Sequence, residues 1–144
     1  MPTLLLLNGP NLGRLGLRKP EVYGTKTLAD VTQEVTVVAA AQGWSVRSLQ
    51  SNHEGELIDF VEANRDAAAL IINPGALMMS GWALRDALED YPGRWIEVHI
   101  SNLFGREAFR HTSVIAPLCH GFIAGMGTDA YAVAASVLVG SDHG

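Results

Sequence analysis

The feature that most constrains the fold of this chain is a regular alternation between short apolar runs and longer stretches with helical periodicity. The apolar runs have the length of single β-strands and cover residues 3–7, 44–49, 68–73, 95–101 and 121–125. The stretches with helical spacing cover residues 28–42, 54–64, 81–91 and 128–139. Five strands interleaved with four helices predict an α/β fold, in which helices cover both faces of a parallel sheet.

The length and composition of the chain fit one ordinary domain. It has 144 residues, of which 48% are hydrophobic and 17% are charged. Such a chain is long enough to bury a core and too apolar to be disordered. We therefore expect residues 1–144 to form a single domain, with residues 141–144 as a frayed tail.

The net charge and the single cysteine indicate which partners and which cellular compartment to expect. A net charge of −5 argues against nonspecific binding to nucleic acid or to an anionic membrane. Cys119 has no second cysteine to pair with, which fits a reducing compartment. No apolar run reaches the length of a membrane span, and the first residues lack the basic start of a signal peptide. The expected location is the cytoplasm.

Polar residues follow three of the expected strands at their carboxyl ends. The first strand runs into residues 8–11, the third into residues 73–75, and the fourth into residues 99–102. The carboxyl ends of parallel strands meet at one edge of the sheet, where folds of this class bind ligands. These amides, hydroxyl and imidazole are therefore expected to meet at one rim.

The fourth strand carries the most distinctive pattern of the chain. Glu97, His99 and Ser101 alternate with apolar residues, so their side chains are expected on one face. A glutamate two residues from a histidine is well placed to hold one imidazole nitrogen, which leaves the other nitrogen for proton transfer. The alternative interpretation is a half-exposed edge strand whose polar face lies in water.

Two further segments carry positive charge near this rim. The connection over residues 8–24 is long for a loop between a strand and a helix, and its Arg18 and Tyr23 suggest a lid that closes over a ligand. Its glycines alternatively serve only as turns. Arg106 and Arg110 are four residues apart and share a face if the segment is helical, which suits an anionic or polyhydroxylated ligand. A solvated surface is the alternative for this pair.

Other chemistries are poorly supported. Residues 125–130 match G-x-G-x-x-A, but no further strand or ribose-binding acid follows, so helix–strand packing explains these glycines better than a dinucleotide. The histidines show no zinc-type pairing, so no metal is assigned. Cys119 lies in an apolar setting that indicates packing, and His53 stands where a helix cap is expected.

Four segments taken together resemble the type II 3-dehydroquinate dehydratases. They comprise residues 7–12 leading to 15–24, residues 50–59, residues 72–76 leading to 83–87, and residues 97–102 leading to 106–111. The resemblance implies a flavodoxin-like fold, a homo-oligomer of trimers assembled into a dodecamer, and no cofactor. It implies a trans elimination of water that converts 3-dehydroquinate into 3-dehydroshikimate through an enolate. This reaction belongs to the shikimate pathway, which leads to chorismate and the aromatic amino acids.

The resemblance also implies a role for each catalytic residue. Tyr23 would be the base that takes the proton next to the ketone, in a positive field supplied by Arg18 and Arg106. His99 would protonate the departing hydroxyl and Glu97 would orient it. Asn11 would hold a water against the developing enolate oxygen.

The implied substrate-binding residues follow the same motifs. Asn73 and the backbone at Ile100 and Ser101 would bind the carboxylate, Arg110 would bind a ring hydroxyl, and Asp86 would reach in from a neighbouring subunit. The chain departs from the family at two places. Met79 stands where the family has a substrate-binding histidine, and Gly13-Arg14 replaces the usual Asn-Leu.

Two alternatives remain open. Met79 is compatible with a lyase of the same fold that acts on a related cyclic hydroxy-ketoacid. The other alternative is a noncatalytic flavodoxin-like assembly module, against which the intact Tyr23 and His99 count.

Overall fold

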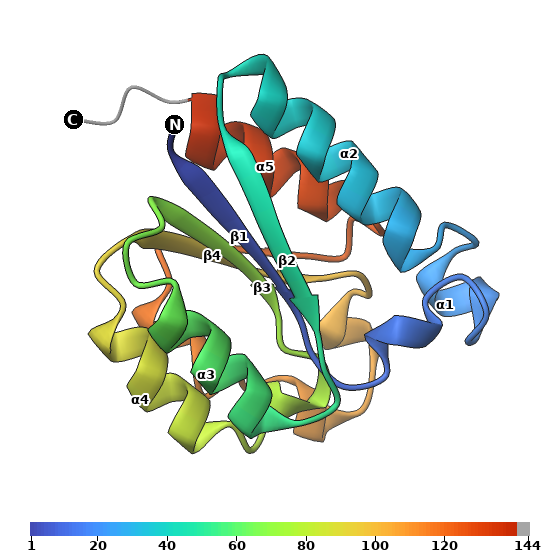
Figure 1. Cartoon of the computed structure of the whole chain (residues 1–144). Coiled ribbons are helices and arrows are strands. Elements are labelled where there is room, and N and C mark those ends of the chain that lie inside the picture. The colour runs from blue at the N-terminus through green and yellow to red at the C-terminus, as the bar shows by residue number, and fades with distance from the viewer. Residues whose placement is uncertain (141–144) are drawn as a thin grey trace.

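The protein folds into one parallel sheet with helices on both sides (Figure 1). The computed structural model describes residues 1–140, with the backbone alone for residues 22 and 23. The strands are β1 (Thr3–Asn8), β2 (Ser45–Gln50), β3 (Ala69–Asn73), β4 (Arg94–His99) and β5 (Gly121–Ala124). The helices are α1 (Pro20–Tyr23), α2 (Leu28–Ala41), α3 (Glu54–Ala63), α4 (Trp82–Asp90) and α5 (Asp129–Gly140). The expected tail over residues 141–144 lies outside the described residues.

The strands stand in the order β2-β1-β3-β4-β5, and all four neighbouring pairs are parallel. This is the flavodoxin-like order, so the predicted fold class is confirmed. The chain steps outward from β1 to β2 and then returns to the other side of β1. The reversal places a switch point between β1 and β3, where Asn8 and Asn73 are register partners at the carboxyl ends.

The four longer helices form two layers, one on each face of the sheet. Helices α2 and α5 pack together on one face of the sheet, and α3 and α4 pack together on the other (Figure 1). Because successive side chains of a strand point to opposite faces, the apolar run of each central strand feeds both cores. Leu4, Leu6, Ile71 and Val98 face α2 and α5, whereas Leu5, Leu7, Ile72 and Trp95 face α3 and α4.

The longest helix illustrates how local sequence sets its bounds. The side chain of Thr27 accepts from the backbone N–H of Asp30, and Asp30 accepts from Thr27 in return, so a capping box fixes the start of α2. Val31 and Val35 lie on the buried face. Gly43, with a φ of +79°, turns the chain away after the last turn.

Strand β4 lies between β3 and β5, and its polar face is buried. Glu97 is 0% exposed and His99 is 5% exposed, which excludes the half-exposed edge strand. The strand ends at His99, two residues earlier than the sequence predicts, so Ser101 lies on the following bend rather than on the strand.

Within residues 1–140, none of the helices is both long enough and apolar enough to span a membrane.

Candidate active site

A cavity of about 220 Å³ opens at the carboxyl ends of β1, β3 and β4, beside the switch point. Its walls come from the loops that follow these three strands, as the sequence predicts. Its polar lining residues are Asn11, Arg18, Asn73, His99, Ser101, Arg106 and Arg110. The apolar remainder includes Leu12, Leu15, Met78, Ile100 and Leu103, so a small ligand would meet several hydrogen-bonding groups against an apolar wall.

His99 reaches the cavity with one ring nitrogen already occupied. Its Nε2 lies 2.5 Å from Oε2 of Glu97, whose other oxygen accepts a 3.1 Å hydrogen bond from the Ser113 hydroxyl. Both carboxylate oxygens are thus satisfied although the side chain is completely buried. A buried carboxylate fixes the orientation of the imidazole, while Nδ1 is left for a ligand. Ser113 was not anticipated from the sequence.

The amide of Asn73 is fixed by a buried network at the switch point. Its Nδ2 donates to the Tyr131 hydroxyl at 2.8 Å, and that hydroxyl donates to Oδ1 of Asn8 at 2.6 Å. Oδ1 of Asn73 accepts from the backbone N–H of Gly75 at 3.1 Å. Burial raises the pKa of Tyr131, so its hydroxyl remains protonated and keeps donating. The orientation of Asn73 is therefore set by a tyrosine on α5, which sequence reasoning missed.

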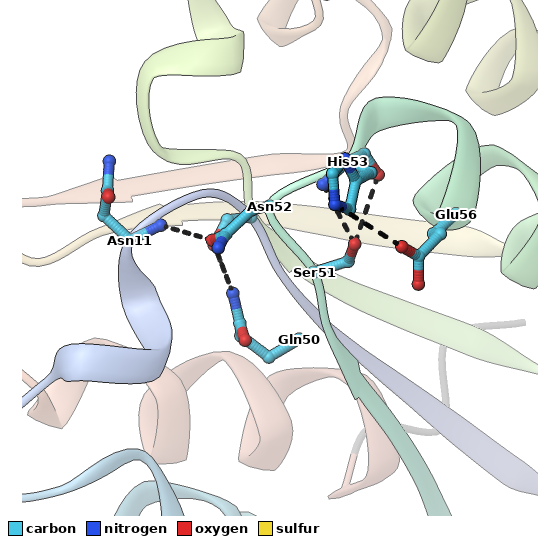
Figure 2. A network of polar contacts seen from close by, with 7 residues as sticks. Asn11, Gln50, Ser51, Asn52, His53 and Glu56 are labelled. Atoms are coloured by element: carbon cyan, nitrogen blue, oxygen red, sulfur yellow. Dashed lines mark hydrogen bonds and ion pairs between the residues drawn. The ribbon is translucent and has the colours of Figure 1, made fainter.

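Asn11 stands at the mouth of the cavity in the left-handed conformation, with φ of 71°. Asparagine tolerates this conformation better than most residues. Its backbone N–H donates to Oδ1 of Asn52 at 3.0 Å, and Gln50 donates to the same oxygen at 3.2 Å (Figure 2). The side chain of Asn11 extends away from Asn52 in that view. The loop after β1 is thus tied to the loop after β2.

Figure 2 also shows the start of α3, where His53 takes the expected N-cap position. The His53 side chain makes no capping hydrogen bond, and the backbone N–H of His53 instead donates to the Ser51 hydroxyl at 2.9 Å. The imidazole lies 4.0 Å from Glu56 and is 77% exposed. It takes no part in lining the cavity.

Three guanidinium groups line the cavity of an acidic protein. Arg106 donates to the Ser101 hydroxyl at 3.3 Å, and Arg110 pairs with Glu107 at 2.5 Å. That hydrogen bond lowers the pKa of the Glu107 carboxyl. Arg106 and Arg110 do not share one helix, because separate 3₁₀ turns cover Leu103–Gly105 and Ala108–Arg110. Both side chains nevertheless reach the cavity, so an anionic ligand is favoured.

Among the described side chains, three that the resemblance implies do not line this cavity. Glu97 lies behind His99. The side chain of Tyr23 lies outside the described part of the chain. Asp86 is exposed on α4. Met79 is half-buried, and its neighbour Met78 takes the position in the cavity wall.

The residues set aside from the sequence have packing roles. Burial raises the pKa of the Cys119 thiol, which keeps it protonated and unreactive. Gly125 adopts a φ of +89°, and a Cβ there would lie 3.3 Å from that of Asn102, so it allows a close turn after β5. Across the described part of the chain, no three His, Cys, Asp or Glu side chains are grouped to hold a metal ion.

Fold and site together define an α/β protein of flavodoxin-like topology whose switch-point cavity combines a histidine–carboxylate pair with several arginines. Residues 2–139 match the family Dehydroquinase class II. The chain belongs to this family, and the predicted family is confirmed.

Several proteins of known name are similar to the chain over nearly its whole length. A 3-dehydroquinate dehydratase of Roseiflexus castenholzii is 52% identical, over 96% of this chain and 88% of that protein. A catabolic 3-dehydroquinase of Pyricularia oryzae is 46% identical, over 92% of this chain and 87% of that protein. The crystal structure of a type II dehydroquinase from Propionibacterium acnes superimposes with a TM-score of 0.92 at 38% identity, covering 98% of both chains.

Proposed function

We propose that this protein is a 3-dehydroquinate dehydratase, which eliminates water from 3-dehydroquinate in trans to give 3-dehydroshikimate. The observation that carries the proposal is the buried Glu97–His99 pair at a cavity lined by three arginines, in a chain that belongs to the class II dehydroquinases. The enzyme acts as a single catalytic domain within each chain. It needs no cofactor, because proton transfers alone carry the reaction.

The reaction begins with the removal of a proton from the carbon next to the ketone. Tyr23 at the end of α1 is the base that we assign. A free tyrosine is ionised to only about one part in a thousand at pH 7, so this role requires nearby positive charge. Arg18 on the same loop and Arg106 at the cavity wall supply it. The electron pair of the broken C–H bond moves onto the ketone oxygen and forms an enolate.

The second step expels the hydroxyl group. As the enolate collapses and the new C=C bond forms, the C–O bond breaks and the leaving oxygen takes a proton from His99. Hydroxide is a poor leaving group, so this proton lowers the barrier. The buried Glu97 carboxylate holds the ring of His99 in place at the cavity wall, which supports His99 as the acid.

The remaining polar groups bind the substrate. Asn73 and the backbone N–H groups of Ile100 and Ser101 hold the carboxylate, beside the guanidinium that Arg106 extends to Ser101. Arg110 binds a ring hydroxyl, and Asn11 holds a water against the enolate oxygen. Fixed N–H donors at a developing oxyanion are among the strongest contributions to catalysis.

The site is completed in an oligomer. Asp86 lies exposed on α4, one turn after Trp82, which is 61% exposed, and tryptophan is a residue type enriched at protein–protein interfaces. We propose that α4 faces the cavity of a neighbouring subunit, in trimers that assemble into a dodecamer. The proposed location is the cytoplasm.

A second candidate function rests on Met79, where the family has a substrate-binding histidine. A thioether cannot donate a strong hydrogen bond, and Met78 makes the adjoining cavity wall apolar. A related cyclic hydroxy-ketoacid with fewer hydroxyl groups is therefore the alternative substrate for the same elimination.

Labelled substrate tests the proposed reaction and its stereochemistry. 3-Dehydroquinate is deuterated at one or the other of the two positions on the carbon next to the ketone, and the product is followed by NMR in the presence of a chelator. Trans elimination loses the deuterium that lies opposite the departing hydroxyl and keeps the other. Loss of the deuterium on the same side as the hydroxyl, or no 3-dehydroshikimate at all, would contradict the proposal.

A further inference from the structure

We infer that Arg14 is a positioning residue for the dehydration, acting through Asn11. Arg14 lies outside the lining of the cavity, but its Nη2 donates to Oδ1 of Asn11 at 2.8 Å. The inference rests on the proposed function, because it concerns the side chain that holds a water against the enolate oxygen. It also concerns one of the two places where this sequence departs from the family motif.

The contact decides which end of the Asn11 amide faces the ligand. An asparagine side chain in front of a helix normally caps it, but Asn11 makes no such bond to the 3₁₀ turn Leu12–Arg14. Its oxygen is taken by Arg14 instead. Within the described residues, the Nδ2 group has no protein acceptor, so its N–H donors are left for the cavity. A guanidinium on the oxygen also polarises the amide and makes the N–H groups stronger donors.

Gly13 leaves space for the side chain of Gln50, which supports the loop that carries Asn11. A Cβ at Gly13 would lie 2.9 Å from Oε1 of Gln50, so a larger residue would displace that side chain. Gln50 donates to Gly9 O and to Asn52 Oδ1, both at 3.2 Å. Asn52 in turn accepts the backbone N–H of Asn11, as Figure 2 shows.

Gly13 and Arg14 therefore both affect Asn11. Gly13 leaves room for Gln50 and Asn52, which hold the backbone of Asn11 in its left-handed conformation, and Arg14 holds the side chain. A leucine at position 14, which the family usually has there, could not donate a hydrogen bond to Oδ1. The amide would then be free to rotate and present its oxygen to the bound water, which would lose the N–H donor that polarises it toward the enolate oxygen.

A double-mutant cycle on 3-dehydroquinate turnover tests the inference. Wild type, Arg14→Leu, Asn11→Ala and the double variant are compared, with melting temperature measured for each. We expect Arg14→Leu to lower kcat about tenfold and change KM less than about threefold, because the contact matters when the enolate forms. In the Asn11→Ala background, Arg14→Leu should have no further effect, since the side chain it positions is gone. Arg14→Lys, which keeps a cationic donor, should recover part of the loss.

Arg65→Leu is the matched control. Arg65 also donates a guanidinium N–H at the surface, to the backbone carbonyl oxygen of Asp90 at 3.0 Å. It follows α3 and lies outside the cavity lining. It should leave kcat unchanged.

The outcomes separate this inference from the proposed function. No turnover by the wild type would contradict the proposed function and the inference with it. If the wild type turns over 3-dehydroquinate normally, two results would contradict the inference alone. One is an Arg14→Leu variant that keeps more than about half of the wild-type kcat. The other is an Arg14→Leu substitution that lowers kcat equally with and without the Asn11 side chain.

Discussion

Nε2 of His99 lies 2.5 Å from Oε2 of Glu97, and the Glu97 side chain has no exposed surface. The two residues are neighbours on one face of β4, so the strand itself sets their separation. Because Glu97 holds one nitrogen, the imidazole can offer only the other to a ligand. The pair thus presents an imidazole of fixed orientation at the wall of a small polar cavity.

Removal of the imidazole should abolish most of the activity. We expect His99→Ala to lower kcat by about 10²–10⁴-fold, because the leaving hydroxyl then lacks a proton donor. Glu97→Gln, which keeps the shape but not the charge, should lower kcat less than His99→Ala does. Steady-state kinetics of both variants test this order. A His99→Ala variant with near-normal turnover would show that another group supplies the proton.

Tyr23→Phe should separate binding from chemistry. The variant lacks the base but keeps the ring, so kcat is expected to fall by about 10²–10⁴-fold while the dissociation constant for substrate changes little. Calorimetric titration with 3-dehydroquinate gives the binding, and rapid-quench kinetics gives the chemical step. Retention of more than about a tenth of the wild-type kcat, well outside the range for a lost general base, would mean that the proton goes elsewhere.

The buried network at the switch point predicts a mixed effect for Tyr131→Phe. The variant leaves Nδ2 of Asn73 and Oδ1 of Asn8 without their shared partner, at a cost of about 1–3 kcal/mol in the free energy of unfolding. Because Asn73 is released to rotate, KM should rise as well. Denaturant unfolding and kinetics measure the two effects on one sample. Loss of stability with an unchanged KM would leave the network a structural role only.

The oligomer is tested by mass. If Asp86 completes the site of a neighbour, the active protein should have a mass several times the 15.4 kDa of one chain, and most simply that of twelve chains. Light scattering on a fully active sample measures it. A fully active species of monomer mass would exclude a shared site.

Hydrophobic periodicity predicts most of the fold but not its contacts. Each expected strand and helix is present, with ends shifted by one or two residues. The early end of β4 moves Ser101 off the strand, because the chain must turn there to form the cavity wall. Whether Met78 or Met79 lines the cavity depends on the rotation of the 3₁₀ turn Gly75–Met78, which sequence spacing does not define.

The contacts that could not be predicted join residues that lie far apart in the sequence. Tyr131 is separated from Asn73 by 58 residues, and it reads as one more apolar residue of a helix rich in alanine and valine. Ser113 likewise carries no local signal, because its partner Glu97 lies on another segment. The Glu97–His99 pair was predictable because both residues belong to one strand, whose period of two places them on one face.

The most direct test of the whole account is kcat/KM of the unmodified protein for 3-dehydroquinate. The rise in ultraviolet absorbance of the conjugated enone product gives the rate, with a chelator present and no nucleotide added. We predict a value within the usual enzymatic range of about 10⁴–10⁸ M⁻¹s⁻¹. A value below about 10² M⁻¹s⁻¹, far under that range, would contradict the assignment of 3-dehydroquinate as the substrate.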